Sequence, residues 1–317
     1  MSLVLGKFFF VHSEDHVAVP KGQSQFIPHE GRLLIVGQEK NEIDQYVSGV
    51  GIIPAGLMGY TSIQEAGGLY TSDDNSGGVQ HAQYLLERYP HTVFQLALYM
   101  VGVLAEIPTG KYDRNIQKLA EWIKQSHRPV YLRIGYEFDL PDNHYNPVEY
   151  KRAYRYIVDH LRKQKVTNVA YVWHSAVIAN RNDHFMDWYP GDAYVAWFAI
   201  SYFDPAQTKR AEVFAKYARE HKKPLMIAEA TPAGMYTVKG KLSWFKRFFD
   251  FIEKEDVKVV SYINYNWDSY PMFKLFNWAD ARIQKNSQVK EMWLEKIQAG
   301  HFLQSSEGLF KKISYEP

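Results

Sequence analysis

The sequence predicts a (β/α)8 TIM barrel, an α/β fold, built as a single domain. Short runs rich in Val, Ile, Leu and Tyr alternate along the chain with amphipathic segments. Most of these runs are nearly continuous rather than alternating, which is typical of strands buried on both faces. The length of 317 residues suits such barrels, which span roughly 200 to 400 residues. We therefore expect residues 1–317 to form one domain, with residues 1–30 as an N-terminal extension that packs on the barrel.

Eight runs are predicted to be strands, and the segments between them supply six clear helices and one weak one. The strands cover residues 32–38, 54–60, 93–99, 130–136, 169–174, 197–203, 225–230 and 259–265. The helices cover residues 40–49, 79–89, 114–126, 147–164, 208–222, 242–256 and 287–299. After the fifth strand, the stretch DHFMDWYPGD has no helical pattern and is predicted to be an excursion or a short turn.

The helix at 147–164 has the clearest signals. Asn146 is suited to cap its first turn, and Pro147 fits the first helical position, where a missing backbone N–H costs nothing. The apolar face then recurs at helical spacing. It consists of Tyr150, Tyr154, Ile157 and Leu161.

A doubly wound open sheet is the main rival to the barrel. That fold often carries a glycine-rich phosphate-binding turn after its first strand. Here the first strand ends in VGQEKNE, which matches neither G-x-G-x-x-G nor G-x-x-x-x-G-K. The missing turn favours the barrel and leaves the open sheet as an alternative.

Composition limits the function classes. A net charge of +2 is far from the basic footprint that nucleic-acid binding leaves, and no apolar run is long enough to span a bilayer. The chain has no cysteine, so disulfides, thiol nucleophiles and cysteine-based zinc sites are excluded. The pair His12 and His16 lacks a helical context and is interpreted as solvated surface. We expect a monomer without cofactor or metal, and a secreted or periplasmic protein whose signal peptide is absent from this sequence.

Two glutamates stand at the ends of predicted buried strands. Glu137 ends the fourth strand and Glu229 the seventh, and in a barrel the chemistry lies at the C-terminal ends of the strands. Buried carboxylates are costly unless they are paired or used. Two that face each other across a pocket suit hydrolysis of a glycosidic bond. The structural alternative is an ion pair between Glu137 and Arg133, which lie four residues apart and so point the same way along a strand.

Aromatic and polar residues at the other strand ends favour a carbohydrate substrate. The predicted stacking walls are Tyr60, Tyr99, Tyr136, Trp173, Tyr202 and Trp267. The predicted partners of sugar hydroxyls are Gln38, His174, Asn264 and Asn266. Arg133 is also predicted to be a substrate-binding residue. Because Trp173 and His174 are adjacent on a strand, one of them should point into the barrel and the other outward.

The stretches RPVYLRIGYEFD and KPLMIAEATP resemble the two catalytic strand ends of clan A glycoside hydrolases, and WYPGDAYVAWFAISYFD is similar to glycoside hydrolase family 26, which includes β-mannanases and β-1,3-xylanases. The resemblance implies retaining hydrolysis with Glu137 as acid/base, its pKa held up by burial, and Glu229 as nucleophile. It also implies that Tyr202 bonds Glu229, that Trp267 is the aromatic floor, and that the carboxyls lie about 5–5.5 Å apart.

Two departures concern the sugar. Family 26 mannanases usually carry His immediately before the acid/base, where this chain has Tyr136, and DLPDNHYNP replaces their tryptophan-rich stretch. Retaining β-glycoside hydrolysis is therefore better supported than mannan as the substrate. Mannan, β-1,3-xylan, mixed-linkage glucan and sulfated or galactose-based algal polymers all stay open. A non-catalytic carbohydrate-binding barrel with an aromatic cleft is the alternative function.

Overall fold

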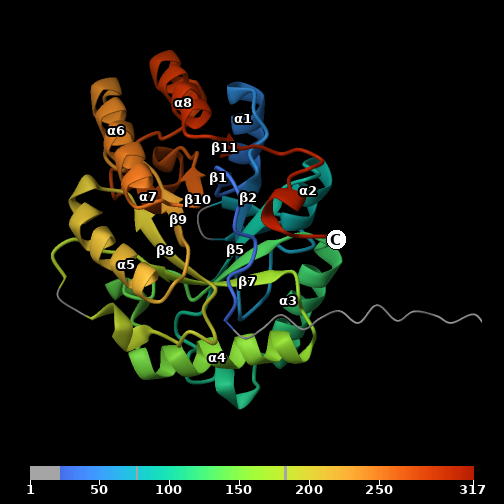
Figure 1. The fold of residues 1–317 in the computed structure, drawn as a ribbon. Coiled ribbons are helices and arrows are strands. Elements are labelled where there is room, and N and C mark those ends of the chain that lie inside the picture. The colour runs from blue at the N-terminus through green and yellow to red at the C-terminus, as the bar shows by residue number, and fades with distance from the viewer. Residues whose placement is uncertain (1–21, 76–77, 182–183) are drawn as a thin grey trace, which may run out of the picture.

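The computed structural model describes residues 22–75, 78–181 and 184–317. Eight parallel strands close into a barrel, with helices around it (Figure 1). In chain order they are β1 (Arg32–Gly37), β2 (Gly56–Ser62), β5 (Val93–Tyr99), β6 (Val130–Ile134), β7 (Val169–Ser175), β8 (Trp197–Tyr202), β9 (Leu225–Ala230) and β10 (Val259–Ile263). Each pairs with the next, and β10 closes on β1 through the register Leu33↔Val259. The predicted barrel is confirmed, and the open sheet is wrong.

The helices follow the predicted order. They are α1 (Lys40–Val50), α2 (Ala82–Arg88), α3 (Asp113–Ser126), α4 (Pro147–Lys163), α5 (Thr208–Glu220), α6 (Val238–Lys254), α7 (Pro271–Lys274) and α8 (Ser287–Ala299). Asn146 caps α4 as predicted, because its side chain accepts hydrogen bonds from the backbone N–H groups of Val148 and Glu149. Between β7 and β8 the described residues form only the short 3-10 helix η3 (Phe185–Trp188), which confirms the predicted excursion.

Short elements complete the described chain. A two-stranded hairpin, β3 (Asp73–Asn75) with β4 (Gly78–Gln80), lies between β2 and α2, and β11 (Phe302–Leu303) pairs with the start of β1. The remaining 3-10 turns are η1 (Ile107–Thr109), η2 (Pro141–Asn143), η4 (Pro205–Gln207), η5 (Trp267–Ser269), η6 (Ile283–Lys285) and η7 (Lys311–Ile313). The hairpin was not predicted, since its strands are three residues long and polar.

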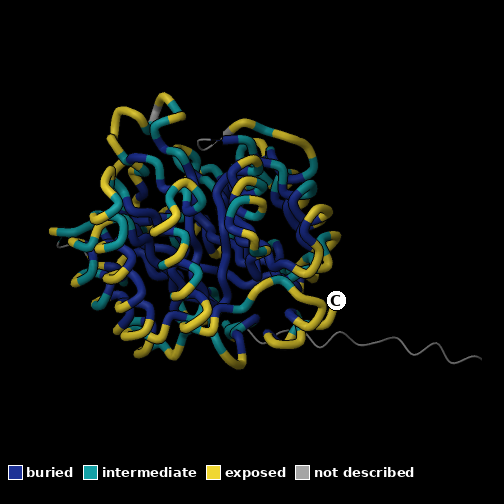
Figure 2. Tube along the Cα trace, turned by 90° about the horizontal axis from the view of Figure 1, so that it is seen from above, coloured by how far each residue is buried: buried dark blue, intermediate teal, exposed yellow. Residues whose placement is uncertain are grey.

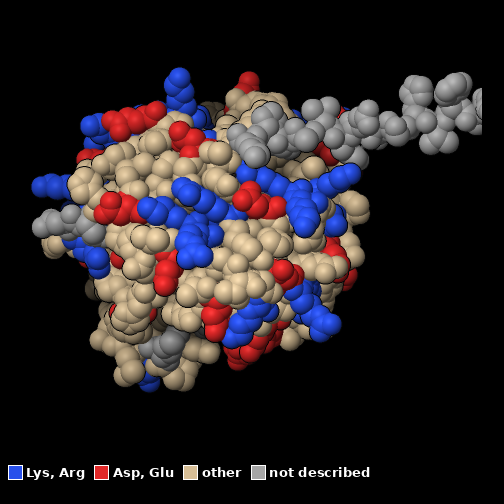
Figure 3. Space-filling view, turned by 90° about the horizontal axis from the view of Figure 1, so that it is seen from below, with Lys and Arg blue, Asp and Glu red and all other residues tan. Residues whose placement is uncertain are grey.

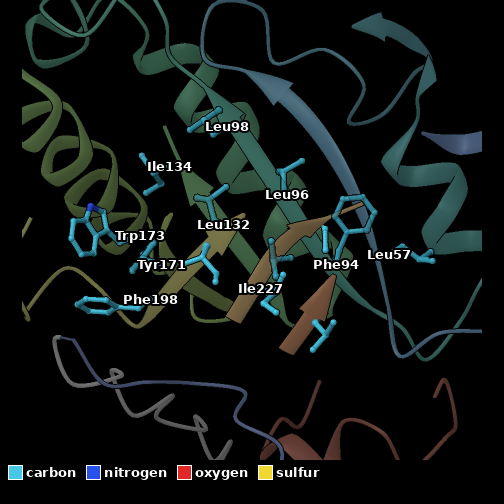
Figure 4. Packing of buried hydrophobic residues seen from close by; sticks show 14 of the residues in the cluster. Leu57, Phe94, Leu96, Leu98, Leu132, Ile134, Tyr171, Trp173, Phe198 and Ile227 are labelled. Atoms are coloured by element: carbon cyan, nitrogen blue, oxygen red, sulfur yellow. The ribbon is translucent and has the colours of Figure 1, made fainter. Parts of the chain in front are cut away.

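The apolar core has two layers, because every barrel strand is buried on both faces. The outer layer lies between strands and helices, and Figure 4 shows part of it, with Leu96, Leu132 and Trp173 on three strands. The inner layer fills the barrel with smaller side chains such as Ala97, Val172 and Ala199. In Figure 2 the buried segments fill the interior of the molecule, and the exposed turns lie on its outside.

The N-terminal ends of the strands are closed by chain segments. The Tyr131 hydroxyl, near the start of β6, donates to the carbonyl oxygen of Phe26 at 2.6 Å, and the indole N–H of Trp197, at the start of β8, donates to that of Gln25 at 2.8 Å. Tyr315 packs edge-on against the Phe26 ring. The described part of residues 1–30 thus packs on the end of the barrel opposite the predicted site. His12 and His16 lie outside the described residues.

Charges of both signs are interspersed over the face shown in Figure 3. This mixture agrees with the small net charge of +2. Among the described helices, none combines the length and the apolar character that crossing a membrane requires.

Candidate active site

A sharp turn at the end of β6 presents Glu137. Gly135 has φ +56° and Glu137 has φ +52°, a left-handed conformation that glycine adopts readily and glutamate rarely. A side chain at position 135 would collide with Met100 and Tyr150, since its Cβ would lie 2.5 and 2.9 Å from their side-chain atoms. The side-chain amide of Asn143 donates to the carbonyl oxygens of residues 136 and 137 at 3.2 and 2.9 Å. The turn is therefore held by both sterics and hydrogen bonds.

Arg133 forms a buried ion pair with Glu229. The guanidinium reaches across the barrel from β6, and its NH1 donates to Oε1 of the Glu229 carboxylate on β9. Arg133 is fully buried and Glu229 is 6% exposed. The structural alternative, in which Arg133 pairs with Glu137, is not what the barrel forms. Two buried charges of opposite sign are brought together, which is the condition under which such groups are tolerated.

Tyr60 and Tyr136 flank the same guanidinium. The Cζ atom of Arg133 lies 5.2 Å from the ring centre of Tyr60 and 5.3 Å from that of Tyr136, within cation–π range. The two rings meet edge to face at 5.5 Å, and the Tyr99 ring lies 6.4 Å from that of Tyr136. Three of the predicted aromatic residues thus gather beside the Arg133–Glu229 pair.

Glu137 lies close to the ion pair and is itself 9% exposed. The hydroxyl of Ser201, on β8, donates to its Oε1 at 2.6 Å. Burial, together with the negative charge of Glu229, raises the pKa of Glu137 to about 8, while the Ser201 hydrogen bond and Arg133 oppose the rise. A carboxyl with this pKa is protonated at neutral pH and can donate a proton.

His174 points into the barrel, and its neighbour Trp173 points outward, as the alternation predicted. The His174 Nε2 lies 3.0 Å from the Ser201 hydroxyl, and its Nδ1 lies 3.3 Å from NH1 of Arg133. Burial, reinforced by Arg133, holds the pKa of His174 well below its usual range. The imidazole is therefore neutral, and its contacts are with protein groups.

Sequence reasoning missed Ser201. It is paired in register with Glu229 on the neighbouring strand, and its side chain is fully buried inside the barrel. The available signal was a small polar residue near the end of a strand that is otherwise apolar, next to a tyrosine that must then face the other way.

Two predicted stacking residues lie outside the barrel. Trp173 stacks on Phe138 at 4.6 Å and packs on Phe214 in the outer layer. Tyr202 shares a hydrogen bond of 3.0 Å with the Thr208 hydroxyl. Its ring packs on Trp244, Phe248 and Phe251. The predictions that Trp173 lines the pocket and that Tyr202 bonds Glu229 are wrong, because the neighbours His174 and Ser201 take the inward positions.

The remaining predicted residues lie near the strand ends. Trp267 follows β10, and its indole N–H donates to the Thr231 hydroxyl, two residues after Glu229, at 3.1 Å. Gln38 follows β1 and is 3% exposed. Asn266 is half-buried and forms a backbone bridge with Asp280.

Two polar residues at these ends have structural partners. The Asn264 side chain accepts from the backbone N–H of Ile283 at 2.8 Å, so it anchors the segment that follows the barrel. Asp139 accepts from the Ser175 hydroxyl and from the backbone N–H of Ala176, both at 2.7 Å, and ties the loop after β6 to β7. In the part of the chain that the structure describes, no three or more His, Asp or Glu side chains form a group that could hold a metal ion.

The fold and the site define a class of protein. A closed (β/α)8 barrel whose fourth and seventh strands each end in a buried glutamate has the arrangement of a glycoside hydrolase. The chain belongs to glycosyl hydrolase family 26, whose sequence profile matches residues 102–274. It is a retaining hydrolase of O-glycosyl bonds with a carbohydrate substrate.

Two relatives agree with this assignment, and a solved structure agrees with the fold. The β-1,3-xylanase TXYA of a Vibrio species is 30% identical over 321 residues, covering 92% of this chain and 70% of the relative. A β-1,3-xylanase of an Alcaligenes species is 29% identical over 321 residues, covering 92% and 68%. The structure of a family 26 β-mannanase from Bacteroides ovatus matches with a TM-score of 0.63 at 16% identity, covering 91% of this chain and 94% of the mannanase. A non-catalytic binding barrel is not favoured, since the relatives named here are enzymes.

Proposed function

We propose that this chain hydrolyses β-1,3-xylan with Glu137 as general acid/base and Glu229 as nucleophile. One observation carries the choice of sugar. The similarity to two β-1,3-xylanases extends over 92% of the chain at 29 and 30% identity. The mannanase from Bacteroides ovatus shares only 16% identity and supports the fold alone.

In the first step, Glu137 gives its proton to the glycosidic oxygen as the bond between that oxygen and the anomeric carbon breaks. Its burial and its raised pKa, about 8, keep it protonated at neutral pH. In the second step, the same group, now a carboxylate, takes a proton from water. The water oxygen bonds to the anomeric carbon and releases the sugar from the enzyme.

Glu229 attacks the anomeric carbon in the first step and forms a glycosyl ester, which the water cleaves in the second. The buried Arg133 forms an ion pair with Glu229 and holds the attacking carboxylate in place. Two inversions at the same carbon give net retention. The separation of about 5–5.5 Å between the carboxyls stays a prediction of this mechanism.

The substrate is proposed to lie along the aromatic residues at the strand ends. Tyr60, Tyr136 and Trp267 offer apolar faces for sugar rings, while Gln38 and Asn266 offer hydrogen bonds to hydroxyls. Arg133 and His174 are not assigned to the sugar, since both are fully buried and bonded to protein groups. We further propose that the chain acts as a monomer, which size-exclusion chromatography with light scattering tests.

A panel of polysaccharides tests the sugar. β-1,3-Xylan, β-1,4-mannan, mixed-linkage glucan and an algal galactan are compared by the release of reducing ends. The proposal expects β-1,3-xylan to be cleaved fastest. Faster release from any other polymer contradicts the choice of sugar but leaves the two glutamate roles standing.

Azide rescue tests the roles. Glu229→Ala is expected to abolish turnover, and azide should restore it on an aryl β-glycoside, giving a glycosyl azide of inverted configuration. Glu137→Ala should lose less activity on a good leaving group, and azide should give the retained β-glycosyl azide. Exchange of these two outcomes, or near-normal turnover of either variant on the polysaccharide, contradicts the roles.

A further inference from the structure

A continuous line of hydrogen bonds joins the two carboxylates inside the barrel. Arg133 NH1 contacts both Glu229 and the Nδ1 of His174, the Nε2 of His174 contacts the Ser201 hydroxyl, and that hydroxyl contacts Glu137. Four different strands supply these side chains, namely β6, β7, β8 and β9, while Glu137 follows β6. The three linking residues Arg133, His174 and Ser201 are fully buried.

Chemistry fixes the direction of every bond in this line. A guanidinium has no acceptor, so Arg133 must donate to Nδ1 of His174. In a neutral imidazole the other nitrogen then carries the hydrogen, so Nε2 donates to the Ser201 oxygen. The single hydroxyl hydrogen of Ser201 is left for Oε1 of Glu137, at 2.6 Å. The line therefore runs as a one-way series of donors from Arg133 to Glu137.

The direction of these hydrogen bonds determines which oxygen of the Glu137 carboxyl carries the proton. An oxygen that already accepts a strong hydrogen bond is the poorer place for the carboxyl proton, because the protonated oxygen is a donor and a weak acceptor. In protonated Glu137, Oε1 therefore stays unprotonated and Oε2 carries the hydrogen.

We propose that His174 and Ser201 are positioning residues that direct the transferable proton of Glu137 to Oε2 and couple this carboxyl to the Arg133–Glu229 ion pair. The inference rests on the proposed roles of Glu137 and Glu229 and adds two residues that touch neither the substrate nor the reacting atoms.

The same bond also sets how readily Glu137 loses its proton. Other charged and titratable groups face this region from the surrounding strands and the loop after β6. They are Arg133, Glu229, Asp139, Tyr60 and Tyr136. Among them only Arg133 is positive, so Ser201 is the other group that stabilises the Glu137 carboxylate. When Glu229 becomes an uncharged ester, its repulsion of Glu137 disappears while the Ser201 bond stays, and both effects favour the carboxylate that activates water.

The test is the pH dependence of kcat/KM. The alkaline limb of this profile reports the pKa of the catalytic acid in the free enzyme. Oligosaccharides of the polymer that the wild type cleaves fastest serve as the substrate. Glu137→Gln is the control that assigns the limb. If the alkaline limb persists in Glu137→Gln, the proposed acid/base role of Glu137 fails, and the inference that rests on this role fails with it.

Ser201→Ala removes the donor without adding volume. A hydrogen bond to a charged group contributes about 1.5 kcal/mol or more, which corresponds to a shift of about one pH unit. We therefore expect the alkaline limb to move up by about one unit in Ser201→Ala. The matched control is Ser261→Ala, which removes another fully buried barrel serine whose hydroxyl donates to Gln95 at 2.8 Å. Its alkaline limb should stay where the wild-type limb lies.

His174→Leu tests whether the histidine acts through the serine. It should move the limb in the same direction as Ser201→Ala but by less, and the double variant should move it no further than Ser201→Ala alone. A folded Ser201→Ala variant whose limb stays within about 0.2 units of the wild type overturns the proposal. So does a double variant whose shift equals the sum of the two single shifts. If His174→Leu fails to fold, Ser201→Ala with its serine control still decides.

Discussion

Replacement of Arg133 by Met is predicted to destabilise the fold severely. The substitution keeps an unbranched apolar stem but removes the guanidinium that pairs with Glu229. It leaves a carboxylate that is 6% exposed without its partner, in a barrel where Arg133 is fully buried. Breaking a buried ion pair by removing one partner costs about 3–5 kcal/mol, because the remaining charge stays desolvated. The bonds from the guanidinium to His174 and Met58 are lost as well.

Urea unfolding at pH 7, monitored by tryptophan fluorescence, measures this loss in the free energy of unfolding. The control is Lys246→Met, which breaks an ion pair of 3.0 Å with Asp250 whose side chains are 72% and 63% exposed. Such a surface pair contributes about 0.5 kcal/mol or less. The double variant Arg133→Met with Glu229→Gln removes both charges and should recover at least about 1 kcal/mol relative to Arg133→Met.

Two results would refute this reasoning. The first is a loss for Arg133→Met that is no larger than that for Lys246→Met. The second is a double variant that is no more stable than Arg133→Met alone, since the cost would then come from lost packing and not from the unpaired Glu229.

Three further outcomes are expected. The pKa of Glu137 is raised from 4.5 to about 8, so between these pH values the folded wild type keeps a proton that the unfolded chain has lost. The wild type therefore loses stability as pH rises through this range. Urea unfolding should show Glu137→Gln to be more stable than the wild type by roughly 1–4 kcal/mol at pH 9 and no more stable at pH 4. Asp139→Ala should cost about 2 kcal/mol by urea unfolding, since the Ser175 hydroxyl and a backbone N–H lose their buried acceptor; a loss under about 0.5 kcal/mol contradicts this. Tyr202→Phe removes the hydroxyl contact with Thr208 and should lower the free energy of unfolding by about 1 kcal/mol. In a reducing-end assay its kcat should stay within about twofold of the wild-type value, and a large fall in kcat would show that Tyr202 takes part in the active site.

Much of the fold could be predicted, because strands buried on both faces leave continuous apolar runs. All eight barrel strands overlap the predicted ranges. The same property hid which way each side chain points. In the run VAYVWHS of β7 and in WFAISY of β8 both faces are buried. The hydrophobic pattern therefore could not show whether Trp173 or His174, and whether Ser201 or Tyr202, points into the barrel.

The partners across the barrel could not be predicted either. Glu137 and Glu229 were found because each ends a buried strand, which is a local property. The pairing of Arg133 with Glu229 joins β6 to β9, two strands that are not neighbours in the sheet. It depends on the closure of the barrel, which no local pattern encodes. The register shift between Ile200 and Ser201, after which Ser201 lies opposite Glu229, is equally invisible in the sequence.

Trapping the covalent intermediate tests the central claim most directly. The enzyme is incubated with an activated 2-deoxy-2-fluoro β-glycoside of the sugar that it cleaves, which slows the breakdown of the glycosyl ester, and the labelled peptide is mapped by mass spectrometry. We predict one fluorosugar per chain, attached to Glu229 in the peptide containing LMIAEA, and no label in Glu229→Gln. A label on Glu137 or on any other residue contradicts the assignment of Glu229 as nucleophile.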